Sequence, residues 1–247
     1  MNIKIISRTI SSILFLEAIM MLPSLIWCFI DREWDVIASF VVSVSLICLA
    51  ALLLRLFTRH ANDNFQAQEG FLTVALSWIV ISAMGALPFF ISGQIPNYVD
   101  AFFETVSGFT TTGASILSDV ESMSRGLLYW RSFTHWLGGM GILVFALAVM
   151  PSSKTGSGKL YLMQAESPGP SVGKLTPRLH TTAGILYGIY VVLTLLCILF
   201  LVLGGMPFFE SLCTAFGTAG TGGFGVRNDS ITSYSPYIQN VCTIFML

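Results

Sequence analysis

Long apolar runs separated by short polar segments make up most of this chain. A helix needs about 20 apolar residues to cross a bilayer. Runs of that length cover residues 10–30, 36–57, 70–92, 127–150 and 181–205. A sixth run starts near Tyr237 and reaches Leu247, which is about half a span. The pattern predicts an all-α polytopic membrane protein, and the short sixth run leads us to expect a truncated sequence or an excerpt of a longer protein.

Two shorter apolar stretches interrupt the segments between these runs. One covers Asp100 to Gly108 after Pro96, and the other follows Pro207 from Phe208 to about Phe216. Each is too short to cross a bilayer, so each is predicted to be a re-entrant half-helix. The C-terminal end of a helix carries partial negative charge, so a cation beyond it is stabilised.

Each half-helix leads into a stretch of threonine and glycine. These stretches are Gly108–Ser115 and Gly217–Gly225, and each follows a similar Phe-Phe-Glu lead-in that contains Glu104 or Glu210. Such backbone is costly in lipid, where its N–H and C=O groups find no water, unless protein buries it or it lines a watery cavity. We therefore predict that the two stretches are strands of an ion-selectivity filter.

The order helix, half-helix, extended strand, helix occurs twice along the chain. Internal repetition of this kind indicates that one structural unit is used more than once. We divide the chain into an N-terminal two-helix hairpin, a first helix–pore–helix repeat, a Ser/Gly/Pro/Lys-rich cytoplasmic linker, and a second repeat truncated in its last helix. Their bounds are 1–57, 58–150, 151–180 and 181–247.

Composition supports the membrane assignment and excludes several functions. Hydrophobic residues make up 54% of the chain and charged residues 10%, whereas soluble domains carry about 25% charged residues. The net charge is −1 and no basic stripe occurs, so nucleic acid is not an expected partner. The five cysteines lack metal-ligand spacing and are expected to be reduced, buried side chains.

Basic residues predict the orientation of the chain in the membrane. Placing the N-terminus in the cytoplasm puts eight Lys and Arg residues inside and four outside, as the positive-inside rule requires. The inside set is Lys4, Arg8, Arg55, Arg59, Lys154, Lys159, Lys174 and Arg178, and the outside set is Arg32, Arg125, Arg131 and Arg227. Both Thr/Gly stretches then lie on the outer side.

The residue types of these stretches suit the passage of a monovalent cation. Carbonyl oxygens can replace the hydration shell of potassium, and glycine permits the backbone angles that this needs. Threonine is expected to keep a strand-like backbone and to add a hydroxyl group. Without a carboxylate, the cage does not favour a divalent ion. The predicted filter residues are Thr111, Thr112, Gly113, Thr221, Gly222 and Gly223, with supporting roles for Thr110 and Gly220.

Four polar residues near the filter have more than one interpretation. Glu104 and Glu210, taken as equivalent in the two half-helices, could complement the helix dipole and bond to neighbours, or could bind the ion directly. Arg131 could anchor its helix at the outer interface, pair with an acid, or tune the electric field at the mouth. His135 could be a helix-packing residue or a proton carrier.

Taken together, these segments make the chain similar to the TrkH-type potassium uptake proteins of the Trk/Ktr/HKT superfamily. The residues that carry the resemblance are Phe102–Ala114, Trp130–Gly141, Ala165–Pro170 and Thr221–Phe224. It implies four repeats around one pore in a bacterial cytoplasmic membrane, with Gly113 and Gly223 as central filter glycines. Glycine at the first of these positions goes with potassium preference. The resemblance also implies a homodimer and a cytosolic nucleotide-binding regulatory subunit.

The expected function is therefore potassium uptake, with this chain supplying two of four filter strands. Whether transport is passive or coupled to another ion as symport stays open. No enzyme activity and no cofactor are expected, and potassium is the transported ion. A non-conducting assembly or sensor subunit is one alternative. An intramembrane enzyme using His135 or His180 is another, although no HExxH or GxSxG motif occurs in the sequence.

Overall fold

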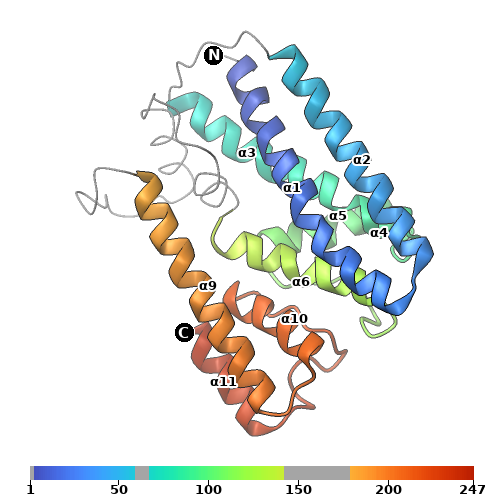
Figure 1. Ribbon diagram of the computed structural model, residues 1–247, viewed down its shortest axis with the longest axis vertical. Coiled ribbons are helices and arrows are strands. Elements are labelled where there is room, and N and C mark those ends of the chain that lie inside the picture. The colour runs from blue at the N-terminus through green and yellow to red at the C-terminus, as the bar shows by residue number, and fades with distance from the viewer. Residues whose placement is uncertain (1–2, 59–66, 142–178) are drawn as a thin grey trace.

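The computed structural model describes residues 3–58, 67–141 and 179–247, and the regular elements in this part are all helices. In chain order they are α1 (Ile3–Asp31), α2 (Trp34–Phe57), α3 (Ala67–Gly85), α4 (Leu87–Ile91), α5 (Tyr98–Phe109), α6 (Arg125–Gly139), α9 (Leu179–Leu203), α10 (Phe208–Ala219) and α11 (Pro236–Met246). Figure 1 shows how they are arranged. The predicted linker 151–180 lies almost wholly outside the described residues.

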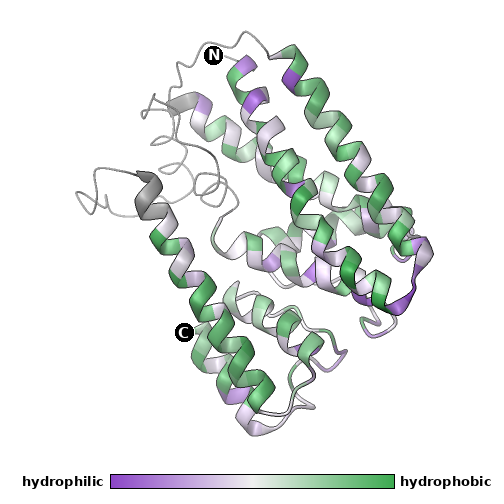
Figure 2. Cartoon of the chain, viewed as in Figure 1, coloured by the Kyte–Doolittle hydropathy of each residue, from purple (hydrophilic) through white to green (hydrophobic). Residues whose placement is uncertain are grey.

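Among the described residues, four segments are long and apolar enough to cross a membrane. They are Ile3–Asp31, Trp34–Phe57, Glu69–Ile91 and Gly184–Leu203. These segments match four of the five predicted runs, because uninterrupted Leu, Ile and Val sequence supports a helix whether its surroundings are lipid or protein. Much of their surface faces outward, and Figure 2 shows α2 and α9 as mainly hydrophobic along their visible sides.

Helices α1 and α2 lie side by side and run in opposite directions (Figure 1). The chain reverses at Arg32, which takes a left-handed conformation with φ of 58°. Inside the pair, the Ser11 hydroxyl donates a hydrogen bond of 2.7 Å to the carbonyl oxygen of Ala51. Helix α1 also contacts α3 and α6.

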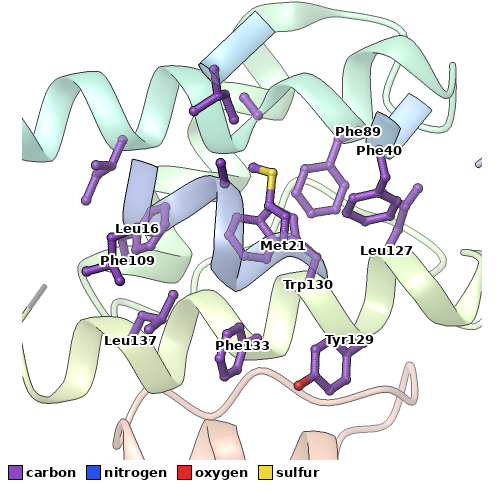
Figure 3. Packing of buried hydrophobic residues seen from close by; sticks show 14 of the residues in the cluster. Leu16, Met21, Phe40, Phe89, Phe109, Leu127, Tyr129, Trp130, Phe133 and Leu137 are labelled. Atoms are coloured by element: carbon purple, nitrogen blue, oxygen red, sulfur yellow. The ribbon is translucent and has the colours of Figure 1, made fainter. Parts of the chain in front are cut away.

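The largest apolar core lies where α1, α3, α5 and α6 meet. Trp130 of α6 is fully buried there, and its ring packs edge-on against Phe109 of α5 with centroids 6.2 Å apart. The indole N–H of Trp130 also donates to the carbonyl oxygen of Gly85 at the end of α3, at 2.9 Å. Figure 3 shows that the labelled side chains of α6 point both ways, toward α1 and toward α10.

The fourth predicted run is not one continuous helix, so this prediction is wrong. We expected one helix through 127–150, but α6 spans Arg125–Gly139, with Met140 as its C-cap and Gly141 following at φ of 74°. Residues 142–150 lie outside the described part of the chain. Helix α6 contacts α5 on one side and α10 on the other, and nearly all its side chains are buried. Its apolar residues therefore face protein rather than lipid, which hydropathy alone cannot distinguish.

The second repeat is smaller in its described part. Helix α10 packs on α9 and on α6, and α11 packs on α9. A separate small core joins these helices through Cys197, Leu201, Met206 and Cys242. Figure 1 shows α9, α10 and α11 grouped beside the end of α6, so that α6 lies between the two half-helices α5 and α10.

Candidate functional site

The two Thr/Gly stretches have the same backbone conformation. We call residues 110–116 the first pore loop and residues 220–226 the second pore loop. Helices α5 and α10 are both 12 residues long and end directly before these loops. The amide of Thr112 donates to Ser107 at 3.0 Å, and the amide of Gly222 donates to Gly217 at 3.1 Å. Every position of the first loop therefore corresponds to the position 110 residues later in the second.

The expected strand-like threonine is wrong for one residue in each loop. Thr111 has a φ of 52° and Thr221 a φ of 55°, both in the left-handed region. Their amides bond back to Gly108 and Thr218, so the chain turns sharply as it leaves each helix. This conformation is unfavourable for a β-branched residue, and sequence preference alone would not have predicted it. No β-strand occurs in either pore loop among the described residues.

The assumed equivalence of the two Phe-Phe-Glu lead-ins is also wrong. Glu104 lies nine residues before Gly113, whereas Glu210 lies thirteen residues before Gly223. The difference is about one helical turn. The structural counterpart of Glu104 is therefore Thr214. The helix ends and the loops define which residues correspond, whereas the similar Phe-Phe-Glu sequences do not align in the structure. Glu104 lies in the middle of α5, while Glu210 lies in the first turn of α10.

The two pore loops touch each other through their main chains. A Cβ atom placed on Gly113 would lie 1.9 Å from the carbonyl oxygen of Gly222. A Cβ atom placed on Gly222 would lie 2.9 Å from the carbonyl oxygen of Thr111. Gly113 and Gly223 have φ values of 75° and 77°, where glycine is favoured. Two segments that are about a hundred residues apart in sequence therefore meet with no room for side chains between them.

Several predicted filter residues remain open to the surroundings. Thr110, Thr112, Thr221 and Gly223 are exposed, whereas Thr111, Gly113 and Gly222 are half-buried and Gly220 is buried. The hydroxyl oxygens of Thr110 and Thr112 lie 2.8 Å apart in a hydrogen bond. The loops thus present polar groups along one open side while helices cover the other side.

Helix α6 fills the space behind both loops. A Cβ atom on Gly138 would lie 2.0 Å from the carbonyl oxygen of Phe109, and one on Gly139 would lie 2.8 Å from Cα of Gly220. The ring of His135 is buried against Gly222, and its centroid lies 3.9 Å from that of Phe224. His135 therefore has the packing position that was one of its two interpretations.

Glu104 and Arg131 form a buried ion pair behind the first loop. Nε of Arg131 donates to Oε1 of Glu104 at 2.6 Å, and the two side chains are 3% and 0% exposed. Glu104 also accepts hydrogen bonds from the hydroxyl of Ser115 and the amide of Ile116, each at 2.9 Å. The structure therefore places Glu104 among hydrogen-bonding neighbours, and it places Arg131 against an acid in the interior.

Arg131 also reaches the second loop. Its Nη1 donates to the carbonyl oxygen of Gly225 at 2.9 Å, and its guanidinium carbon lies 3.6 Å from the centre of the Phe224 ring. Sequence reasoning did not find these contacts of Arg131 with Phe224 and Gly225. No local signal marks them, because the partners come from different repeats.

Glu210 belongs to a different and more open pair. Nε of Arg227 donates to Glu210 at 3.3 Å, and their side chains are 39% and 22% exposed. The Tyr234 hydroxyl also bonds to Glu210, and the Arg227 guanidinium lies over the Tyr234 ring at 4.8 Å. These three residues all belong to the second repeat, so the bonds of Glu210 connect residues within that repeat and do not reach the first.

No group of three or more His, Cys, Asp or Glu side chains suited to holding a metal ion occurs in residues 3–58, 67–141 and 179–247. The side chain of His180, named in the enzyme alternative, lies outside the part that the structure describes. The five cysteines are free thiols, and all of them are buried except Cys48, which is half-buried.

Comparison with known proteins gives a consistent set of matches. The family described as TrkH, cation transport protein, matches residues 37–247. A Trk system potassium uptake protein TrkH from Halomonas elongata is 36% identical across 100% of this chain and 51% of its own length. The protein of the same name from Escherichia coli K12 is 42% identical over 76% of this chain and 39% of its own length.

A solved structure matches the fold as well. The crystal structure of the potassium transporter TrkH from Vibrio parahaemolyticus superimposes with a TM-score of 0.81 at 30% identity, covering 99% of this chain and 49% of that chain. The chain thus spans about half the length of the relatives that it matches over its whole extent.

Proposed function

Since this chain belongs to the TrkH family of cation transport proteins, we propose that it forms part of a transporter that takes up potassium ions across a membrane. Relatives that match the whole chain carry the name potassium uptake protein. The main observation in support is the main-chain contact between the two pore loops at Gly113 and Gly222. Carbonyl-rich backbone brought together from two repeats is what a path for a dehydrated cation requires.

The proposed ion path uses the main-chain oxygens of both loops. Thr111, Thr112 and Gly113 contribute from the first loop, and Thr221, Gly222 and Gly223 from the second. Thr110 and Gly220, which begin the loops, support this backbone. Two loops that touch cannot surround an ion, and the family resemblance implies four filter segments, of which this chain supplies two. The oxygens carry partial charge only, which suits a monovalent ion.

The wider arrangement follows from the family resemblance. The transporter lies in a bacterial cytoplasmic membrane with its N-terminus in the cytoplasm, forms a homodimer, and responds to a cytosolic nucleotide-binding subunit. The outward-facing apolar surfaces of α2 and α9 (Figure 2) support contact with lipid. Potassium is the cargo of this transporter, and no step of the proposed transport needs a bound cofactor or an enzymatic reaction.

The decisive experiment replaces the first filter glycine in a four-repeat transporter that contains this sequence. Gly113→Ser adds a side chain where the two loops meet, so potassium-over-sodium selectivity should fall, measured as uptake of both ions in cells that lack other potassium uptake. Gly93→Ser is the matched control. Gly93 has a similar φ of 73°, but a Cβ atom there would meet nothing within 4 Å, so selectivity should be unchanged.

Two outcomes would count against the proposal. If the transporter with unaltered sequence fails to restore growth on low potassium, the sensor alternative becomes the better explanation. If growth is restored but Gly113→Ser leaves selectivity at the level of Gly93→Ser, the ion passes elsewhere.

A further inference from the structure

The buried pair of Glu104 and Arg131 touches corresponding points of the two pore loops. Glu104 accepts hydrogen bonds from Ser115 and from the amide of Ile116, directly after the first filter segment. Arg131 donates to the carbonyl oxygen of Gly225, directly after the second. Gly225 is the counterpart of Ser115 in the register of the two loops, 110 residues later. The pair therefore connects equivalent ends of two filter segments.

The chemistry of the two side chains suits this connection. Arginine presents several N–H donors in one rigid plane, so it can hold two partners in fixed directions at once. Here Nε holds Glu104 at 2.6 Å and Nη1 holds Gly225 at 2.9 Å. Both side chains are almost fully buried, and in such surroundings a hydrogen bond to a charged group is strong and an unpaired charge is very unfavourable.

We propose that Glu104 and Arg131 are positioning residues that hold the two pore loops at a fixed separation and thereby set how closely the filter fits its ion. This inference rests on the proposed potassium filter. The pair itself does not touch the ion. It acts through the main chain of Ser115–Ile116 and of Phe224–Gly225, and the Phe224 ring contacts both the guanidinium of Arg131 and the ring of His135.

The second repeat provides a comparison within the same molecule. Glu210 and Arg227 also form an ion pair, but both belong to the second repeat and both are partly exposed. The segments that follow the two pore loops are also connected, because the Val120 amide donates to the side-chain oxygen of Asn228 at 2.7 Å. The Glu104–Arg131 pair differs from both, because it is buried and lies beside the filter segments.

The test is amide hydrogen exchange on the purified protein in lipid nanodiscs, read at Ile116 in the first loop and Gly223 in the second. Arg131→Lys keeps a positive charge but loses the two-directional fork, and Glu104→Gln keeps the size but loses the charge. Each variant should speed exchange in both loops by roughly ten- to a hundredfold, the range for losing a charge-assisted hydrogen bond. Arg227→Lys is the matched control and should leave Ile116 unchanged.

The effect of each variant on the loop that its residue does not contact distinguishes a connection between the loops from local stabilisation. If Arg131→Lys affects only the second loop and Glu104→Gln only the first, the two residues stabilise their own neighbours and the proposal fails. Should either variant fold poorly, Ser115→Ala removes one bond to Glu104 from an exposed residue. It should speed exchange at Gly223 by roughly two- to tenfold, and no change there would overturn the inference.

Transport supplies a second and independent readout. In a four-repeat transporter containing this sequence, Arg131→Lys and Glu104→Gln should each lower potassium-over-sodium selectivity, whereas Arg227→Lys should not. If the unaltered transporter carries no potassium, the proposed function fails while hydrogen exchange still decides whether the pair connects the loops. If transport works and selectivity is unchanged in both variants, the connection does not set the fit of the filter.

Discussion

The first and second pore loops share a backbone conformation but differ in what holds them. The first loop follows a helix that carries a buried glutamate, and that glutamate pairs with Arg131, which is equally buried. The second loop follows a helix with Glu210 in its first turn, and the partners of Glu210, Arg227 and Tyr234, are partly exposed. Helix α1 adds a further layer behind α3 and α6 in the first repeat.

This difference shows that the shape of the loops depends on helix ends and glycines, whereas the rigidity of the loops depends on tertiary partners. Thr111 and Thr221 adopt nearly the same strained φ although their neighbouring side chains differ. Equal geometry therefore does not mean equal tolerance to substitution.

The largest expected difference concerns the two ion pairs. Arg131→Met leaves Glu104 buried without its countercharge, so it should lower the free energy of unfolding by about 3–5 kcal/mol. Arg227→Met removes a partly exposed pair and should lower it by about 1 kcal/mol or less. Unfolding of the purified protein in detergent, followed by tryptophan fluorescence, gives both values. Equal losses would mean that the two repeats are held in the same way.

The two central glycines should respond unequally to alanine. Both have positive φ, which disfavours alanine by about 1–2 kcal/mol. A Cβ atom on Gly113 would also collide with the carbonyl oxygen of Gly222, whereas one on Gly223 would meet only Cε of Met246 at 4.0 Å. Gly113→Ala should therefore be destabilising by a further 1–3 kcal/mol or so. Thermal unfolding of both variants tests this, and a larger loss at Gly223 would contradict the observed contact between the loops.

The layer behind the first half-helix contains a buried acid. Glu17 of α1 is fully buried, and neither carboxylate oxygen has a hydrogen-bond partner among the described residues. A Cβ atom placed on Gly85 would lie about equally close to Oε1 of Glu17 and to the side chains of Thr105 and Phe109. Burying such a polar group without a bond is unfavourable by about 1–3 kcal/mol.

Glu17→Met should therefore raise the thermal stability of the purified protein. Leu14→Met, a similar-sized exchange at another buried position of α1, is the control and should change stability little. A loss of stability in Glu17→Met, with Leu14→Met neutral, would show that the carboxyl group has a stabilising role in the first repeat.

The smallest expected effect concerns the hydrogen bond between Asn228 and Asp119, which connects the segments that follow the two pore loops. The side-chain amide of Asn228 donates to Asp119 at 2.8 Å, and this hydrogen bond holds the pKa of Asp119 below its usual value. Because the folded pKa is lowered, the stabilisation is fully present above the unfolded pKa of about 3.9. It is lost as the pH falls through the folded pKa.

Asp119→Asn removes this titration. The variant should therefore be slightly less stable than the unaltered protein near about pH 6, and the difference should be smaller near about pH 3. Melting temperatures at both pH values provide the measurement. A difference that is undiminished at the lower pH would show that the charge of Asp119 does not stabilise the connection.

Much of the fold could be predicted from the sequence, and the exceptions have a common physical origin. Helices α2 and α9 agree with their predicted runs because a continuous Leu-, Ile- and Val-rich segment needs no particular partner to be helical in an apolar environment. Helix α6 did not agree, because its end at Gly139 and its burial between α5 and α10 depend on neighbours from both repeats. The similar Phe-Phe-Glu sequences likewise suggested that Glu104 and Glu210 correspond, which is wrong by about one helical turn.

The sequence by itself determined where apolar helices alternate with Thr/Gly segments, and that the alternation occurs twice, because hydropathy and glycine content act locally. Tertiary structure decided that Gly113 meets Gly222 and that Glu104 pairs with Arg131. Each of these depends on residues far apart in the chain. Their pairing is settled by packing and by the need of a buried charge for a partner, and no local pattern encodes it.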